Sequence, residues 1–122
     1  MPISYRIDAE AGLVRTVAHG VLTDADLMSM KEQLARDPAF VAGMHQLSDV
    51  RGIERLDVSA DGIRSFVAHD RRHAERFAGH RMAIVANADV VFGMARMYQT
   101  MSHVDVGVFR SVEEALAFLG KA

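Results

Sequence analysis

The chain contains no cysteine, so it can form neither a disulfide bond nor a zinc or iron–sulfur site with cysteine ligands. Lysine is scarce as well: Lys31 and Lys121 are the only two, and arginine supplies the remaining positive charge. The formal net charge is −2, so no overall field attracts nucleic acid, and no lysine-rich run indicates an anchor at a membrane surface. We therefore expect no nucleic-acid partner.

Long apolar runs are also missing. No stretch approaches the roughly 18 residues that a membrane-spanning helix needs. Residues 1–6 lack the basic region and the apolar run of a signal peptide. We therefore expect a cytoplasmic protein without an integral membrane segment, for which peripheral contact with a membrane stays open.

What is present is typical of one globular domain. Half of the 122 residues are hydrophobic and a quarter are charged, and a chain of this length can bury a sizeable core. No repeat, linker or low-complexity segment divides the chain. We predict a single domain over residues 1–122.

The pattern of apolar residues predicts how the chain begins. Alternation over residues 3–7 and again over 13–19 indicates two strands joined by a turn, which form a β-hairpin. A helix should begin after Thr23, whose hydroxyl can cap it, and should stop at Asp37-Pro38.

Strands and helices then alternate to the end of the chain. We predict strands at 44–50, 81–87 and 104–109, and helices at 59–77, at 89–101 with Asp89 as its cap, and from a capping box at Ser111. This order predicts an α/β fold with a mostly parallel or mixed five-stranded sheet and four helices, led by a hairpin. Residues 82–86 are apolar enough for a central strand covered on both faces, with helices 59–77 and 89–101 flanking it.

Ligands of such folds tend to bind outside the carboxyl ends of the strands. The predicted strand ends and the helix starts that follow them place five polar residues at that edge: Asp49, Arg51, Ser59, Asn87 and Asp89.

Two segments, Phe92-Gly93-Met94-Ala95-Arg96-Met97-Tyr98 and Val108-Phe109-Arg110-Ser111-Val112-Glu113-Glu114-Ala115-Leu116, resemble the SpoIIAA-like proteins. That group of small bacterial domains is related in fold to the STAS domains, which are anti-sigma-factor antagonists. The resemblance implies a SpoIIAA/STAS-like fold and a regulatory or binding role rather than catalysis.

The STAS pattern also implies a phosphorylation switch, which this sequence departs from. The pattern ends a strand with Asp and places Asp-Ser-Ser-Gly eight residues later, with the first serine as acceptor. Here Asp49 and Asp57 keep the spacing, but Val58 stands at the acceptor position and Ala60 at the glycine. Only Ser59 could take the phosphate, if the helix began one residue later.

Two histidines, His69 and His73, lie four residues apart and so share one face of the predicted helix 59–77. That spacing can hold zinc, but a zinc site needs a third ligand, and the direction of His80 is open. We interpret the pair as part of a solvated helix face.

Asp70 falls in the middle of the apolar stripe of the same helix. A carboxylate there costs several kcal/mol, roughly, unless it is paired or hydrogen-bonded. We therefore predict that Asp70 is buried and bonded to a basic side chain or to backbone amides. Its role is structural or ligand-binding.

In the predicted helix 89–101, Phe92 and Arg96 lie together on the side opposite the apolar face. An exposed phenylalanine beside arginine is either an ordinary surface contact or part of a partner or ligand site. The chain also has eight methionines, which fill irregular core space or line adaptable binding surfaces.

The resulting hypothesis is a non-enzymatic regulatory or binding module without cofactor or metal. Its partner would be an apolar or amphipathic small molecule, such as a lipid, or another protein, and a homodimer is allowed. The candidate site residues are Asp49, Arg51, Ser59, Asp70, Asn87, Phe92 and Arg96. The alternatives are a phospho-regulated anti-sigma-factor antagonist that uses Ser59, and a small metal-dependent enzyme that uses His69 and His73.

Overall fold

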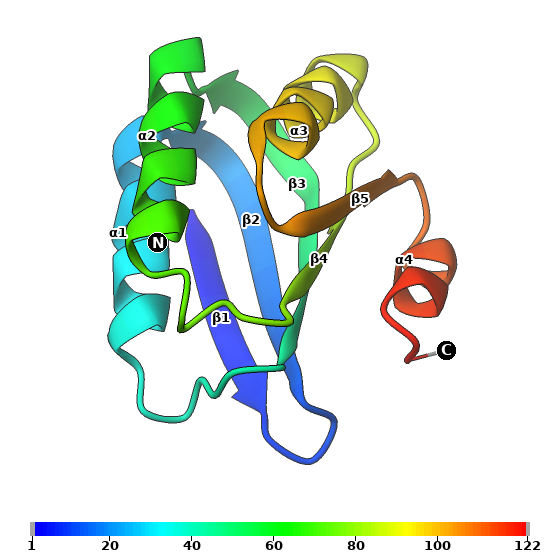
Figure 1. Cartoon of the computed structure of the whole chain (residues 1–122). Helices are drawn as coiled ribbons and strands as arrows, with labels where there is room; N and C mark the ends of the chain where they lie inside the picture. Colours follow the sequence, from blue (N-terminus) through cyan, green and yellow to red (C-terminus); the bar gives the residue numbers. More distant parts are fainter. Residues whose placement is uncertain (1, 122) are drawn as a thin grey trace.

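The structure, a computed structural model, describes residues 2–121 as one five-stranded sheet with four helices (Figure 1). The strands are β1 (Ile3–Asp8), β2 (Leu13–Thr23), β3 (His45–Asp57), β4 (Arg81–Val85) and β5 (Asp105–Phe109). The helices are α1 (Asp24–Arg36), α2 (Ala60–Arg72), α3 (Asp89–Met101) and α4 (Val112–Phe118). The predicted α/β order is confirmed.

The sheet is mixed, with the strands in the order β1-β2-β3-β4-β5. β1 and β2 form the predicted antiparallel hairpin, and each later strand pairs in parallel with the one before it. The hairpin turn closes at Gly12, where a φ of 63° places the backbone in the left-handed region that glycine tolerates. No helix in the described chain is both long and apolar enough to cross a bilayer.

Three predicted boundaries were wrong by four residues or more, and the predicted strand 81–87 ends at Val85. β2 and β3 extend to Thr23 and Asp57, well beyond residues 19 and 50, and pair with each other along this length. Irregularities in the pairing between Val17 and His19 and between Gly20 and Val21 break the alternation, which hid the second half of both strands from the sequence pattern.

α2 ends at Arg72 rather than at residue 77. Beyond it the chain continues in turns with i→i−3 bonds, such as Phe77 N–H to the Ala74 carbonyl at 3.2 Å. Such turns keep a near-helical spacing, so Phe77 still reaches the core, where it is 4% exposed.

The helices form two unequal layers. α1, α2 and α3 cover one face of the sheet, and α4 packs on the other face (Figure 1). In β4, Met82 and Ile84 face the three-helix layer, and Ala83 and Val85 face α4, so the predicted burial of both faces is confirmed. The predicted arrangement was wrong in two respects: β3 is the middle strand, and the second and third helices share one face.

Side chains start three of the four helices. Thr23 caps α1 in a capping box with Asp26. At the start of α4 Ser111 accepts from the Glu114 amide, which is half of the predicted capping box, and the Glu114 carboxylate accepts from the Ser111 hydroxyl. The predicted cap of α3 was wrong, since Asp89 is its first residue and follows an N-cap without a side-chain bond. The Asp89 carboxylate instead pairs with Arg110 at 3.1 Å.

Candidate functional site

A cavity of about 90 Å³ lies between the three-helix layer and the sheet. The backbone of α2 lies close to α1 and α3 but not to the strands. This separation leaves space between α2 and the sheet for side chains and for the cavity. The lining residues are mostly apolar and come from all three helices and from β1 to β4: Ile3, Thr16, Leu22, Leu27, Met30, Gln46, Ser48, Val50, Ile53, Leu56, Val58, Ile63, Phe66, Met82, Ile84, Val91, Met94, Ala95 and Tyr98.

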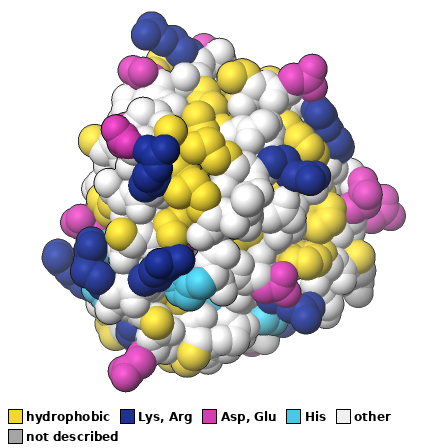
Figure 2. Space-filling view, turned by 45° about the horizontal axis from the view of Figure 1, so that its top comes forward, with side chains coloured by type: hydrophobic (Ala, Val, Ile, Leu, Met, Phe, Trp, Pro, Cys, Tyr) yellow, Lys and Arg dark blue, Asp and Glu magenta, His cyan; other side chains and the backbone are white. Residues whose placement is uncertain are grey.

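The direction of β3 gives the cavity two different ends. Gln46 and Ser48, near the start of the strand, are buried, whereas Ile53 and Leu56, near its carboxyl end, are half-buried. The cavity is therefore closed at the end where Gln46 and Ser48 lie, and it is open at the carboxyl edge of the sheet. Figure 2, which turns that edge forward, shows a band of hydrophobic side chains there with charged side chains beside it.

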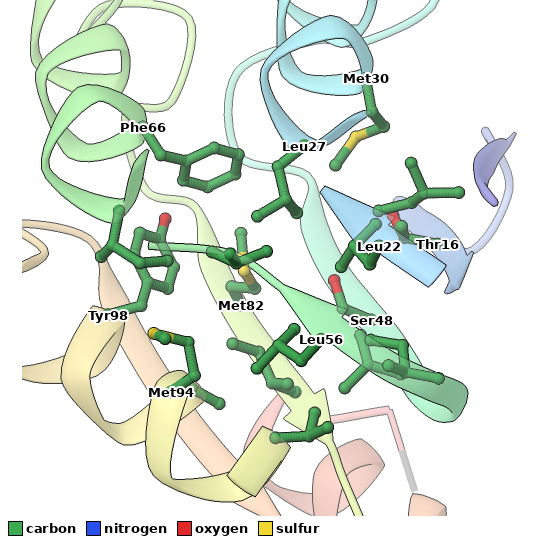
Figure 3. A pocket seen from close by; sticks show the side chains of 18 of the residues that line it. Thr16, Leu22, Leu27, Met30, Ser48, Leu56, Phe66, Met82, Met94 and Tyr98 are labelled. Carbon is green, nitrogen blue, oxygen red and sulfur yellow. The ribbon is translucent and has the colours of Figure 1, made fainter. Parts of the chain in front are cut away.

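Three of the eight methionines, Met30, Met82 and Met94, line the cavity. Figure 3 shows them on α1, β4 and α3, with Phe66 of α2 facing the same space. Methionine has several rotatable bonds and no branch, so these walls can adapt to an occupant. The interpretation of methionine as an adaptable lining applies to these three residues.

The closed end of the cavity is polar. The Gln46 amide lies 2.9 Å from Thr16 Oγ1 and 3.2 Å from Ser48 Oγ, and its other end lies 3.2 Å from His80 Nε2. His80 Nδ1 lies 2.6 Å from the Met44 carbonyl oxygen. Burial, with the nearby charge of Lys31, lowers the pKa of His80 to about 4, so the ring is neutral near pH 7.

Asp70 lies beside this cavity, fully buried, as the sequence predicted. Its Oδ1 lies 3.3 Å from the Lys31 ammonium, and the Tyr98 hydroxyl donates to its Oδ2 at 2.7 Å. Lys31 also lies between the rings of Phe66 and Phe77, 4.9 and 4.6 Å from their centroids. The carboxylate therefore links one residue from each of α1, α2 and α3.

Burial changes the pKa values of the two residues that contact Asp70. It raises the pKa of Tyr98 well above its usual value, with a further contribution from Asp70, so the hydroxyl stays protonated and donates. Burial also lowers the pKa of Lys31, and the Asp70 charge opposes that effect. The contacts of Asp70 are those of a structural group that joins three helices.

The structure places the two histidines of the predicted pair against each other. The His69 and His73 rings stack with centroids 4.3 Å apart, and His73 Nδ1 contacts the His69 carbonyl. Within residues 2–121 no group of three or more histidine, aspartate or glutamate side chains is placed to hold a metal ion. His69 is buried rather than solvated, which corrects that part of the interpretation.

Asp49, Arg51 and Asn87 come together, but not at the cavity. They line a shallow hollow of about 390 Å³. Asp49 alternates with the cavity-lining Ser48 and Val50, so it lies on the opposite face of the sheet. Arg51 makes two hydrogen bonds to the Asp49 carboxylate, at 2.9 and 2.8 Å, which hold the pKa of Asp49 below its usual value.

Ser59 caps α2 and is bound to α1. Its hydroxyl accepts from the Gly62 amide at 2.9 Å and donates to Asp24 Oδ2 at 2.7 Å, and its own amide donates to Asp24 Oδ1 at 2.9 Å. A phosphate on Ser59 would face the Asp24 carboxylate, and like charges at this distance repel. Ser59 therefore contacts Asp24 and Gly62, and it does not line the hollow that contains Asp49 and Arg51.

Phe92 is half-buried, and the cation over its ring is Arg110, 4.1 Å from the centroid. Arg110 also donates to the Asn87 carbonyl and to Asp89. The predicted surface pair of Phe92 with Arg96 is therefore replaced by a contact between α3 and the loop after β5, and Arg96 is exposed.

The sequence analysis missed the residues that shape the cavity. Lys31 follows Leu27 by four residues and precedes Leu34 by three, so it stood on the core-facing stripe of α1 and could have been matched with Asp70. Thr16 of β2 and Ser48 of β3 each lie at a position whose side chain points into the core. They become neighbours only because β2 pairs with β3 in this register.

Comparison with known proteins agrees with the observed architecture. The SpoIIAA-like family model matches residues 13–120. A crystal structure from Shewanella loihica PV-4, described as an uncharacterized protein of the DUF3478 family with a SpoIIAA-like fold, is similar with a TM-score of 0.64. Its sequence identity is 19%, and the match covers 96% of this chain and 93% of that one. Among curated proteins, none matches this chain.

Proposed function

The chain belongs to the SpoIIAA-like family, and on that premise we propose that it is a non-enzymatic module that binds an apolar or amphipathic small molecule. The binding site is the cavity between α1, α2, α3 and the sheet. The family is generally non-enzymatic and includes STAS anti-sigma antagonists. Membership of this family is compatible with a binding role but does not identify a ligand.

The apolar cavity is the observation that carries the proposal. Core cavities destabilise a protein by about 24 cal/mol per Å³, because the atoms around them lose contacts. For a cavity of about 90 Å³ the cost is about 2 kcal/mol when it is empty. A ligand that restores those contacts recovers this free energy, and the half-buried Leu56 and Met94 at the open end provide an entry.

The test uses n-pentane as a small apolar probe and NMR of protein labelled with ¹³C at the methionine methyl groups. Pentane should shift the methyl signals of Met30, Met82 and Met94 saturably and leave Met28, outside the lining, unchanged. Ala95→Leu fills the cavity from α3 and should abolish the shifts. Ala68→Leu, at an exposed position of α2, should leave them as in the wild type.

A protein partner is the second candidate, favoured by the uncovered part of the α4-side sheet face. Val17 and Val21 of β2 are 49% and 46% exposed, and Val17 adjoins the hollow that contains Asp49 and Arg51. Exposed apolar side chains beside fixed charges are a common feature of partner surfaces. If pentane causes no saturable shift of the three methyl signals, the small-molecule proposal fails and this surface becomes the leading candidate.

A further inference from the structure

We infer that the molecule bound in the cavity carries a hydroxyl group, which binds between Thr16 and Ser48 at the closed end. The inference rests on the proposed function, since it identifies the chemical class of that ligand. It follows from three properties of the site: two paired hydroxyls, the absence of charge in the lining, and the small volume.

The two hydroxyls are neighbours on adjacent strands. Thr16 of β2 and Ser48 of β3 are partners in the parallel register, and both line the cavity. They are 1% and 6% exposed, so bulk water does not satisfy them. Figure 3 shows their oxygen atoms close together on the sheet, on the side from which Leu27, Met30 and Phe66 approach.

The hydrogen bonds within the protein leave capacity on both side chains. A hydroxyl group has one donor and two acceptor positions. The Gln46 amide lies within hydrogen-bond distance of both oxygens, and whichever way its ends point it uses one position on each. Each hydroxyl keeps a free position beside its bond to Gln46, and a net hydrogen bond contributes about 0.5–1.5 kcal/mol, so an occupant that bonds to Thr16 and Ser48 is favoured over a purely apolar one.

An uncharged group fits this end better than an ion. Among the residues that the structure describes, the cavity lining includes no charged side chain. The nearest charged side chains, Lys31 and Asp70, are paired with each other, and the Tyr98 hydroxyl donates a hydrogen bond to the Asp70 carboxylate. An ammonium or carboxylate would lose its hydration there without a counter-ion. A hydroxyl both donates and accepts, so it satisfies Thr16 and Ser48 in either orientation of the Gln46 amide.

The volume sets the size of the part that enters. An engineered protein cavity of about 150 Å³ holds benzene, so a cavity of about 90 Å³ takes about four non-hydrogen atoms. A longer molecule would keep the remainder at the open end, beside Ile53 and Leu56. The inferred ligand is therefore an alcohol whose hydroxyl end and first few carbons are buried.

The experiment compares 1-butanol with n-pentane, which differ only by a terminal hydroxyl in place of a methyl group. Methionine-methyl NMR titrations give both dissociation constants for the wild type, Thr16→Val and Ser48→Ala. Each substitution should weaken 1-butanol binding about fivefold, which is within the range for one hydrogen bond, and change pentane binding less than twofold. Thr100→Val and Ser65→Ala, at exposed positions, are the matched controls.

The orientation of bound 1-butanol supplies a second measurement that needs no variant. Nuclear Overhauser contacts should join its CH₂–OH protons to the Thr16 methyl group and its terminal methyl group to Leu56. The opposite orientation of 1-butanol would overturn the inference and leave the proposed function intact. The same would follow if Thr16→Val and Ser48→Ala changed the dissociation constants of 1-butanol and pentane by the same factor. If neither ligand shifts the methyl signals of Met30, Met82 and Met94, the proposed function fails and the inference with it.

Discussion

The ammonium of Lys31 lies 3.3 Å from Oδ1 of Asp70, and the two side chains are 1% and 0% exposed. This ion pair joins α1 to α2, and the Tyr98 hydroxyl extends it to α3. The three helices that enclose the cavity are thus held to one another by a buried polar group, while α2 makes few close backbone contacts with the sheet. The contacts of Lys31, Asp70 and Tyr98 hold the three helices in place around the cavity, and these contacts do not occupy the cavity itself.

Asp70→Ala should lower the free energy of unfolding by about 3–5 kcal/mol, because it leaves the Lys31 ammonium buried without a partner. Urea unfolding followed by circular dichroism measures the change. Asp61→Ala is the control, since Asp61 is exposed and should change stability by less than about 0.5 kcal/mol.

Replacing both ions at once should cost much less. Lys31→Met with Asp70→Leu and Tyr98→Phe removes the pair together with the hydroxyl that would lose its acceptor, and fills a similar volume, so this triple variant should recover most of the stability lost in Asp70→Ala. A loss below about 1 kcal/mol for Asp70→Ala itself would show that the carboxylate does not hold the helices together.

His80 should make stability depend on pH. Its pKa is about 4 in the folded protein and 6.5 when exposed, so the unfolded chain takes up a proton first as the pH falls. The free energy of unfolding should therefore decrease between pH 6.5 and pH 4, by at most about 3 kcal/mol from this group. Burial lowers the pKa of His69 as well, which adds a contribution of the same sign.

The comparison of His80→Phe with the wild type isolates this effect. The variant keeps an aromatic ring against Phe40 and Phe77 but cannot take up a proton. Its stability should fall less steeply from pH 6.5 to pH 4, whereas His103→Gln, at an exposed position, should retain the wild-type slope. Equal slopes for all three proteins would rule out a buried neutral His80.

Gly62→Ala should destabilise the protein, against the usual rule for helices. Replacing glycine by alanine within a helix normally stabilises by about 0.5–1 kcal/mol. At Gly62 a Cβ atom would overlap the Asp24 carboxylate, so the contact of Asp24 with Ser59 would have to break. In an Asp24→Ala background the same substitution should become stabilising.

Gly93→Ala is the matched control for that experiment. Gly93 lies in α3, and a Cβ atom there meets no atom within 4 Å, so the substitution should show the ordinary stabilising effect. Thermal denaturation of the four variants measures the sign. Stabilisation by Gly62→Ala in the wild-type background would mean that Asp24 does not pack against the start of α2.

The sequence predicts the element order and the burial of Asp70 because both depend on local patterns. Periodicity identifies strands and helices, and one polar residue on an apolar stripe is visible at helical spacing. The length of β2 and β3 is not predicted, since the irregular pairing near His19 and Val21 breaks the alternation.

The cavity could not be predicted for a different reason. It depends on how far α2 lies from the sheet and on the pairing that places Thr16 beside Ser48, which no local pattern reports. Of the five polar residues predicted at the strand ends, Asp49, Arg51 and Asn87 come together, but they line a hollow on the other face of the sheet. The sequence predicts which residues reach an edge better than which face they occupy.

Native mass spectrometry of the protein purified from its own cells tests the central claim most directly. The account predicts that the wild type carries a neutral adduct, which organic solvent releases, and that Ala95→Leu, with its cavity filled, does not. A wild type with the same bare mass as Ala95→Leu, before and after extraction, would contradict the claim that this cavity holds a ligand.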